Sequence, residues 1–349
     1  MTDELEQREP DQLEGVRLPE YQTGLVGHAA ARAGLLAQLV EDRLPGGIMI
    51  HGPRGIGKAT LAFDIAREIF RRTGDEEPSH IRDQVAAGSY PNLRVLRKAA
   101  RETGKGFYTV IRVEEVRELI ERLHRTRGRA GHRVVIVDAI DDCNASSANA
   151  LLKILEEPPA DTLFLLVSHR PGQLLPTIRS RCHQLALRPL SDADVRAVLA
   201  DGMPDADDGA LDRAVALAGG RPRRGFEALL MGDSGSLTAL QAWLDNPAKP
   251  PVSAHLGLAD VLGADRGSAA AHFARDIILD WLAAEARGAA GAGPSARRRL
   301  ASANELWDKA HALFADADEY NLDARQTLIV IFDAIRKHVQ RQAFLTELS

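Results

Sequence analysis

A glycine-rich stretch near the start of the chain has the residue types and spacing of a phosphate-binding loop. An apolar run from Ile48 to Ile50 leads into three glycines, and Lys58 then opens an amphipathic helix. Glycines let successive backbone N–H groups point inward, and a helix N-terminus beside a lysine attracts phosphate. The stretch therefore predicts a strand, a loop and a helix that together bind phosphate groups. The residues predicted to form this site are Gly52, Pro53, Arg54, Gly55, Ile56, Gly57, Lys58, Ala59 and Thr60.

The residue after the lysine departs from the phosphate-loop pattern. That position normally carries Ser or Thr, whose hydroxyl binds Mg²⁺, whereas this chain has Ala59. Thr60 does not replace it, because one step along a helix turns a side chain by roughly 100°. We therefore expect a loop that can hold ATP only weakly and that holds a metal ion poorly.

Asp138 is a second candidate for the same site, because it ends the apolar run from Val134 to Val137. Four β-branched residues predict a strand that is buried on both faces of a parallel sheet, with the carboxylate at the edge where ligands bind. In phosphate-loop proteins this aspartate helps to hold Mg²⁺. The alternative, an ordinary strand with a capping aspartate, is weaker because a phosphate loop precedes it.

Alternating strands and helices surround these candidate residues. Further strands are predicted at residues 93–96, 134–137, 162–167 and 184–187, with helices at 113–124 and 146–157. This alternation predicts an α/β domain with a doubly wound parallel sheet. The charged stretch 71–89 has no clear periodicity, which predicts an exposed, irregular segment. Beyond Pro189 only helical patterns occur.

These patterns divide the chain into four parts. Residues 1–20 are acidic and poor in apolar side chains, which predicts a flexible tail. A nucleotide-binding-like domain is expected over 21–188, and a small helical lid over 189–235. Residues 236–349 are predicted to be helical throughout, with apolar stripes that form either a core or a surface for partner subunits.

The composition excludes several classes of protein. The 44 basic and 49 acidic residues give a net charge of −5, so any contact with DNA would be local. Cys143 and Cys182 cannot form a disulfide framework or a four-ligand cluster, so no zinc is expected. The sequence contains no signal segment and no long apolar run, which predicts a cytoplasmic protein without membrane contact.

The order of a phosphate-loop domain, a helical lid and an all-helical end resembles the AAA+ subunits of bacterial clamp loaders. Two further motifs carry the resemblance, namely the run from Asn149 to Pro159 and the tripeptide Ser180-Arg181-Cys182 after residues 175–179. The resemblance is strong over residues 21–230 and only architectural beyond them. It implies an AAA+ P-loop domain, a helical lid and a C-terminal collar domain used in oligomerisation.

Two alanines indicate which type of subunit the chain resembles. In the ATP-hydrolysing subunits the strand aspartate is followed by a glutamate that activates water, whereas Ala139 follows Asp138 here. Together with Ala59, this change removes a metal ligand and the general base. The chain therefore resembles the delta-prime subunits, whose own nucleotide site is degenerate. Many clamp-loader subunits also carry a four-cysteine zinc module, and residues 59–133 contain no cysteine.

The resemblance implies a role in trans for Arg181. In the family this arginine reaches the γ-phosphate bound by a neighbouring subunit and stabilises the charge of the transition state. In the chain's own site, Lys58 would bind the β- and γ-phosphates and Asp138 would face the nucleotide or the metal.

Two sensor positions are also implied. Ser168, after the strand at 162–167, lies where the family has a polar sensor residue, although a plain strand-end serine fits equally well. The second sensor follows Gly219-Gly220 and is Arg223 by one alignment or Arg224 by another.

The resemblance thus implies a non-hydrolysing subunit of the DNA-directed DNA polymerase holoenzyme, with no ATPase or polymerase activity of its own expected. Its partners would be the other clamp-loader subunits (gamma/tau and delta), the sliding clamp and primer–template DNA through the complex. The main alternative is an ATP-hydrolysing motor subunit of the gamma/tau type, which requires Ser or Thr at position 59 and Glu at position 139. A P-loop kinase would leave Ser180-Arg181-Cys182 and the helical end unexplained.

Overall fold

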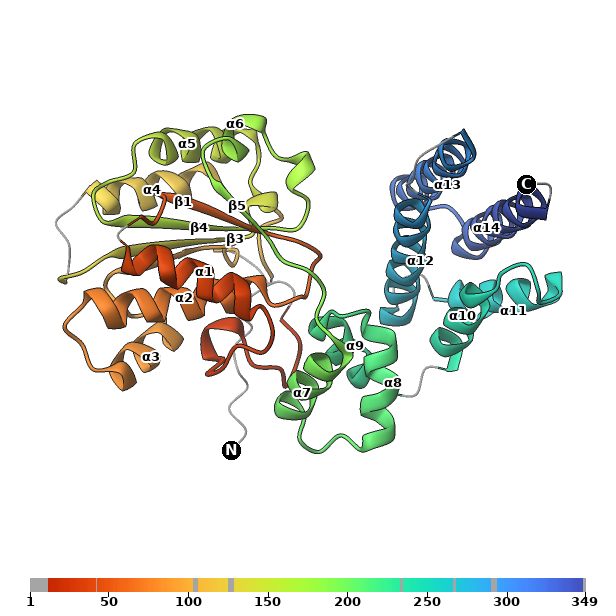
Figure 1. The fold of residues 1–349 in the computed structure, drawn as a ribbon, viewed down its shortest axis with the longest axis horizontal. Helices are drawn as coiled ribbons and strands as arrows, with labels where there is room; N and C mark the ends of the chain where they lie inside the picture. Colours follow the sequence, from red (N-terminus) through yellow and green to blue (C-terminus); the bar gives the residue numbers. More distant parts are fainter. Residues whose placement is uncertain are drawn as a thin grey trace. The chain divides into compact units, whose positions relative to one another are not determined.

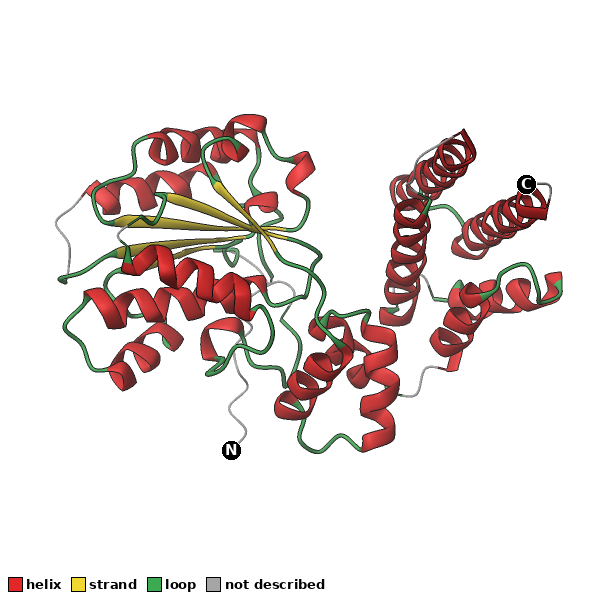
Figure 2. Cartoon of the chain, viewed as in Figure 1, coloured by secondary structure: helices red, strands yellow, loops and turns green. Residues whose placement is uncertain are grey.

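In the computed structural model the described residues are 12–41, 43–102, 106–124, 129–232, 235–265, 268–289 and 294–347. The chain divides into two compact units, Met1–Leu230 and Met231–Ser349. The first unit contains a parallel sheet with helices on both faces, followed by a small helical module. The described part of the second unit consists of helices and their connections (Figure 1, Figure 2).

Five parallel strands form the sheet, in the order β2-β3-β4-β1-β5. Their bounds are β1 Gly47–His51, β2 Leu93–Leu96, β3 Arg133–Asp138, β4 Thr162–Ser168 and β5 His183–Ala186. Strand β4 is buried along its full length, which explains its continuous apolar sequence. In the register, His51 lies opposite Ser168 and Asp138 lies opposite Val167. The C-terminal ends of three strands therefore meet at one edge of the sheet.

Successive strand residues point to opposite faces of the sheet, and each face has its own apolar core. Ile48 and Leu165 join the core under α1, α2 and α3, whereas Met49 and Phe164 join the core under α4, α5 and α6. The bounds of these helices are α1 Ala29–Val40, α2 Lys58–Thr73, α3 Pro78–Ala86, α4 Val113–His124, α5 Ala145–Glu156 and α6 Pro176–Arg179. Figure 1 shows the two helical layers on either side of the strands. The predicted doubly wound α/β class is confirmed.

The expectation of an exposed, irregular segment over residues 71–89 is wrong for the second half of that stretch. Residues Pro78–Ala86 form α3, in which Ile81 and Val85 are 2% and 1% exposed and pack into the core beside α2. These two apolar residues are the helix's main contribution to the core. Two positions four residues apart are too weak a pattern to recognise among so many charges.

The segment before α1 packs against the first unit. Leu18 and Glu20 are buried, and the 3-10 helix η1 Pro19–Tyr21 contacts α2 and α3. The last residues of the predicted tail are therefore part of the folded unit. Residues 1–11 lie outside the described residues, and the flexible tail stays a prediction for them.

Three short helices follow the sheet, and they are α7 Asp192–Gly202, α8 Asp208–Ala218 and α9 Pro222–Met231. Ser191 caps α7 by accepting a hydrogen bond from Asp194 N, and Asp207 caps α8 in the same way. Helix α8 ends at Gly219, which adopts the left-handed conformation. The predicted helical lid is present as this module, while its exact limits at residues 189 and 235 stay a prediction.

The second unit has its own apolar core. Its helices are α10 Gly235–Asp245, α11 Val252–Leu262, α12 Ala269–Gly288, α13 Pro294–Glu319 and α14 Ala324–Glu347. Trp243 and Phe332 pack with ring centroids 4.9 Å apart, and Ile278 and Ile335 are fully buried. The apolar stripes of α12 and α14 therefore form much of this core. Among the helices in the described ranges, none is both long and apolar enough to span a bilayer.

Candidate functional site

The glycine-rich stretch forms a tight turn between β1 and α2. Gly52, Gly55 and Gly57 all have positive φ values, of 149°, 82° and 95°. A Cβ atom at Gly52 would lie 2.5 Å from the carbonyl oxygen of Leu187, and one at Gly55 would lie 2.7 Å from Cβ of Arg223. Both the backbone conformation and the close packing therefore require glycine at these positions.

Lys58 lies inside this turn at the start of α2. Its side chain is buried, and Nζ donates hydrogen bonds to the carbonyl oxygens of Gly52 at 2.8 Å and Pro53 at 2.6 Å. Burial lowers the pKa of Lys58 to about 8, while Asp138 and Asp141 oppose this shift. The amine thus remains mostly protonated at pH 7 and carries a positive charge into the loop.

The residues after Lys58 supply no metal ligand at the expected position. The Ala59 methyl group packs against the core of this face of the sheet. One neighbouring contact was not evident from the sequence. The His28 ring Nε2 lies 2.7 Å from the carbonyl oxygen of Ile56, although the two residues are 28 positions apart. His28 stands just before α1, so this contact joins the first helix to the loop.

The carboxylates at this edge of the sheet are all engaged by groups of the chain. Asp138 forms an ion pair with Arg97, whose Nη2 lies 3.5 Å from Oδ2. Asp141 accepts hydrogen bonds from Ser168 Oγ at 3.2 Å and from the backbone N–H groups of His169 and Arg170. In the 3-10 helix η2 Ile140–Asp142, the last residue pairs with Lys98 at 3.0 Å.

These pairings do not fit a bound Mg²⁺ ion. A P-loop metal site needs a hydroxyl beside the lysine and a carboxylate with free lone pairs. Here position 59 carries a methyl group, and the carboxylate of Asp138 already faces the guanidinium of Arg97. Within the described residues, no group of three or more His, Cys, Asp or Glu side chains is arranged to hold a metal ion.

Ser168 lies beside the phosphate loop on the neighbouring strand. It is fully buried at the end of β4, and its carbonyl oxygen accepts a hydrogen bond from Gly52 N at 3.3 Å. Its hydroxyl donates to Asp141, as described above. The structure therefore brings Ser168 to the site, and its use as a sensor stays a prediction.

The two candidate second sensors differ in position. The backbone N–H of Arg223 donates to the carbonyl oxygen of Gly55 at 3.2 Å, and its side chain bonds Glu227 at 2.9 Å. Arg224 is buried, with 6% of its surface exposed. Helix α9 thus touches the phosphate loop through Arg223.

Arg181 lies at the other edge of the sheet. It follows α6, and its backbone carbonyl and the Cys182 thiol lie next to Gly47, where β1 begins. The phosphate loop follows the far end of the five-residue strand β1. Since a strand rises about 3.3 Å per residue, roughly 13 Å separates the two edges. Arg181 therefore cannot reach phosphates bound in the chain's own loop.

The Arg181 guanidinium is held by local contacts. Nη2 lies 2.5 Å from Glu156 Oε1, and Nη1 donates to the carbonyl oxygen of Thr177 at 2.9 Å. One third of its side chain is exposed, compared with half of that of Glu156. An exposed ion pair of this kind exchanges readily for another acceptor, because its net contribution is small.

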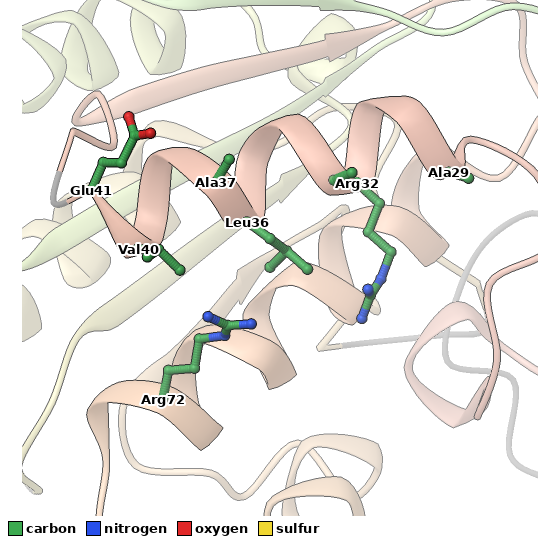
Figure 3. A pocket seen from close by; sticks show the side chains of 8 residues that line it. Ala29, Arg32, Leu36, Ala37, Val40, Glu41 and Arg72 are labelled. Carbon is green, nitrogen blue, oxygen red and sulfur yellow. The ribbon is translucent and has the colours of Figure 1, made fainter.

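One surface hollow lies apart from these residues. It has a volume of about 510 Å³ and is lined mainly by α1, with Arg72 of α2 (Figure 3). None of the predicted site residues lines it.

Comparison with known proteins links the first unit to a replication family. Residues 27–191 match the family described as DNA polymerase III, delta subunit. A delta-prime subunit of DNA polymerase III from Pseudomonas aeruginosa is 38% identical over 178 residues, which are 50% of this chain and 52% of that protein. A gamma/tau subunit from Mycobacterium tuberculosis is 31% identical over 208 residues, 57% of this chain and 35% of that protein.

The chain thus spans about half the length of the delta-prime relative from Pseudomonas aeruginosa. Among solved structures, a DNA polymerase III gamma subunit-related protein from Thermotoga maritima has a TM-score of 0.42 at 16% identity. That likeness covers 88% of this chain and 99% of the other, and a score this low establishes nothing about function.

Proposed function

We propose that this chain, whose residues 27–191 match the family described as DNA polymerase III, delta subunit, is a clamp-loader subunit of the delta-prime type with a function in trans. The chain is a non-hydrolysing subunit that supplies Arg181 to the active site of a neighbouring ATPase subunit. It thereby helps the loader to place the sliding clamp on primed DNA. Its partners are the gamma/tau and delta subunits, the clamp and, through the complex, primer–template DNA.

The position of Arg181 is the observation that carries this proposal. The guanidinium is partly exposed and lies at the edge of the sheet opposite to the chain's own phosphate loop. Its exposed ion pair with Glu156 orients it without burying it. A planar, permanently charged group of this kind can bind two phosphate oxygens of a nucleotide presented by another subunit, which is typically worth roughly 10³ to 10⁵ in rate.

The surroundings of the chain's own loop support the absence of hydrolysis. Ala59 and Ala139 remove a metal ligand and the residue that would activate water. Lys58 still offers a positive charge to an anion, so weak binding of ATP without turnover is compatible with the site. Of the two candidate second sensors, the contact with Gly55 favours Arg223.

Substitution of Arg181 tests the proposed role. We expect Arg181→Ala to leave folding and assembly intact while it lowers the ATP turnover of a loader reconstituted with gamma/tau and delta. The loss in turnover is partial, because other subunits retain their own arginines, and clamp loading falls further since it needs coordinated sites. Arg181→Lys should not restore either activity, because a point charge lacks the planar fork.

Arg179→Ala is the matched control, because this exposed arginine lies two residues away on α6. It should behave like the wild type in both assays. Equal ATPase and clamp-loading rates for the wild type and Arg181→Ala at matched assembly would make Arg181 a structural residue.

The gamma/tau-type motor is the second candidate, and the gamma/tau relative gives it a basis. The two candidates differ in the activity of the isolated chain. We expect no ATP hydrolysis above background from the purified protein with Mg²⁺, measured as phosphate release. A turnover number near 1 s⁻¹, at the low end for ordinary enzymes, would support the motor instead.

A further inference from the structure

Arg97 is a positive charge placed where a P-loop protein would hold its divalent cation. It follows strand β2 at the C-terminal edge of the sheet, and its Nη2 lies 3.5 Å from Asp138 Oδ2. Because Mg²⁺ binds carboxylate oxygens at about 2.1 Å, an ion on Asp138 would stand within about 6 Å of this guanidinium. Like charges this close in a largely buried site repel each other, and the carboxylate of Glu20 offsets only part of this repulsion because it lies on Arg97 and not on the ion.

Arg97 cannot easily move aside, because other contacts hold it. Its two terminal nitrogens donate to the two carboxylate oxygens of Glu20 at 3.0 and 3.1 Å. The guanidinium also lies 5.4 Å from the centroid of the Phe63 ring. The side chains of Arg97 and Glu20 are 15% and 8% exposed, so the bidentate pair is largely shielded from water.

The neighbouring carboxylates do not replace Asp138 as ligands for a metal ion. Asp141 uses both oxygens to accept hydrogen bonds around Ser168, and Asp142 pairs with Lys98 at 3.0 Å. Among the described residues, Asp138, Asp141 and Asp142 are therefore each already engaged by an ion pair or by hydrogen bonds from the chain.

We infer that Arg97 closes the metal site of the phosphate loop by acting as a built-in cation for Asp138. Any polyphosphate that enters the loop is bound as the free anion, by Lys58 and by backbone N–H groups. Ala59 is then only part of the reason why metal is excluded. Restoring a hydroxyl at position 59 does not by itself restore a metal site, because the charge on Arg97 remains.

The experiment compares ATP binding to the full-length chain in Mg²⁺ and in EDTA by isothermal titration calorimetry. Three variants are used: Ala59→Ser; Ala59→Ser with Glu20→Gln and Arg97→Gln; and Ala59→Ser with Arg97→Lys. Glutamines at 20 and 97 remove both charges of the buried pair together, so Glu20 is not left as an uncompensated carboxylate and Asp138 becomes available to a cation. Lysine at 97 keeps the charge.

We expect Mg²⁺ to leave the affinity of Ala59→Ser and of the lysine variant unchanged, and to raise that of the triple variant about tenfold or more. A gain for Ala59→Ser alone would overturn the inference, because the hydroxyl would then suffice. The absence of a gain in the folded triple variant would also overturn it, since removal of Arg97's charge would not have opened the site.

Thermal melts establish that each variant is folded. If the triple variant is not, Ala59→Ser with Arg97→Gln takes its place, because glutamine can still donate a hydrogen bond to Glu20. The test needs no other loader subunit, so its outcome is independent of the role proposed for Arg181.

Discussion

Lys58 is the residue whose charge is most affected by the fold of the phosphate loop. Its pKa falls from 10.5 to about 8, and burial is the largest cause of this shift. Between these values the unfolded chain binds a proton that the folded chain does not, so the free energy of unfolding rises with pH. Each pKa unit corresponds to about 1.4 kcal/mol, which predicts a gain of about 2 to 3 kcal/mol between pH 7 and pH 10.

Comparison of the wild type with Lys58→Met by urea unfolding over this pH range isolates the gain. The wild type should become more stable relative to the variant as the pH rises. Lys153→Met, at an exposed position on α5, corrects for the general loss of a lysine. A difference that stays constant from pH 7 to pH 10 would show that Lys58 is not desolvated in the folded chain.

At the scale of elements, the junction between sheet and lid depends on one of two adjacent glycines. Gly219 and Gly220 both have positive φ, of 56° and 73°. A Cβ atom at Gly220 would lie 2.5 Å from Pro189 Cβ and 2.7 Å from the backbone oxygen of Leu190, whereas one at Gly219 meets nothing within 4 Å. The carbonyl of Gly220 also accepts a hydrogen bond from Leu190 N at 2.8 Å.

Alanine at each glycine should therefore have unequal effects. Gly219→Ala has only the conformational cost of a left-handed residue, about 1 to 2 kcal/mol. Gly220→Ala adds a clash with backbone atoms that cannot rotate away, so we expect a further loss of at least about 1 kcal/mol. Thermal melts followed by circular dichroism measure both. Similar losses for the two variants would mean that the linker at 189–190 can move to make room.

At the scale of the whole molecule, each of the two units has its own core. All three tryptophans, Trp243, Trp281 and Trp307, lie in the second unit, so their fluorescence follows that unit alone. Leu165 lies in the central strand of the first unit and is fully buried. Truncation to alanine there should cost about 2 to 5 kcal/mol, because it leaves a cavity between close-packed elements.

We expect Leu165→Ala to lower the denaturation midpoint of the first unit, seen by circular dichroism, and to leave the tryptophan transition in place. Val95→Ala is the control, since this residue lies on the edge strand β2 and is 37% exposed. It should shift the same transition by less than about 1 kcal/mol. A parallel shift of the tryptophan signal in Leu165→Ala would show that the two units unfold together.

The sequence by itself determined the features that are encoded within a few neighbouring residues. The spacing of Gly52, Gly55 and Lys58 defined the phosphate loop, because backbone conformation and helix start are local properties. The apolar runs of β3 and β4 defined the buried strands in the same way. Helix α3 was missed because only Ile81 and Val85 supply its apolar side to the core.

Only the tertiary structure decided which distant residues meet. Arg97 and Glu20 are 77 positions apart in the chain and join at Asp138, a contact that no local spacing predicts. The one sequence signal for Arg97 was its place directly after a strand, at the ligand-binding edge of the sheet. In the same way, the contact of Arg223 with Gly55 depends on how α9 packs on the loop, and the place of Arg181 beside the start of β1 depends on strand order, because β5 pairs with β1. Strand order follows from how the whole chain packs its two cores, and so it is absent from any short stretch of sequence.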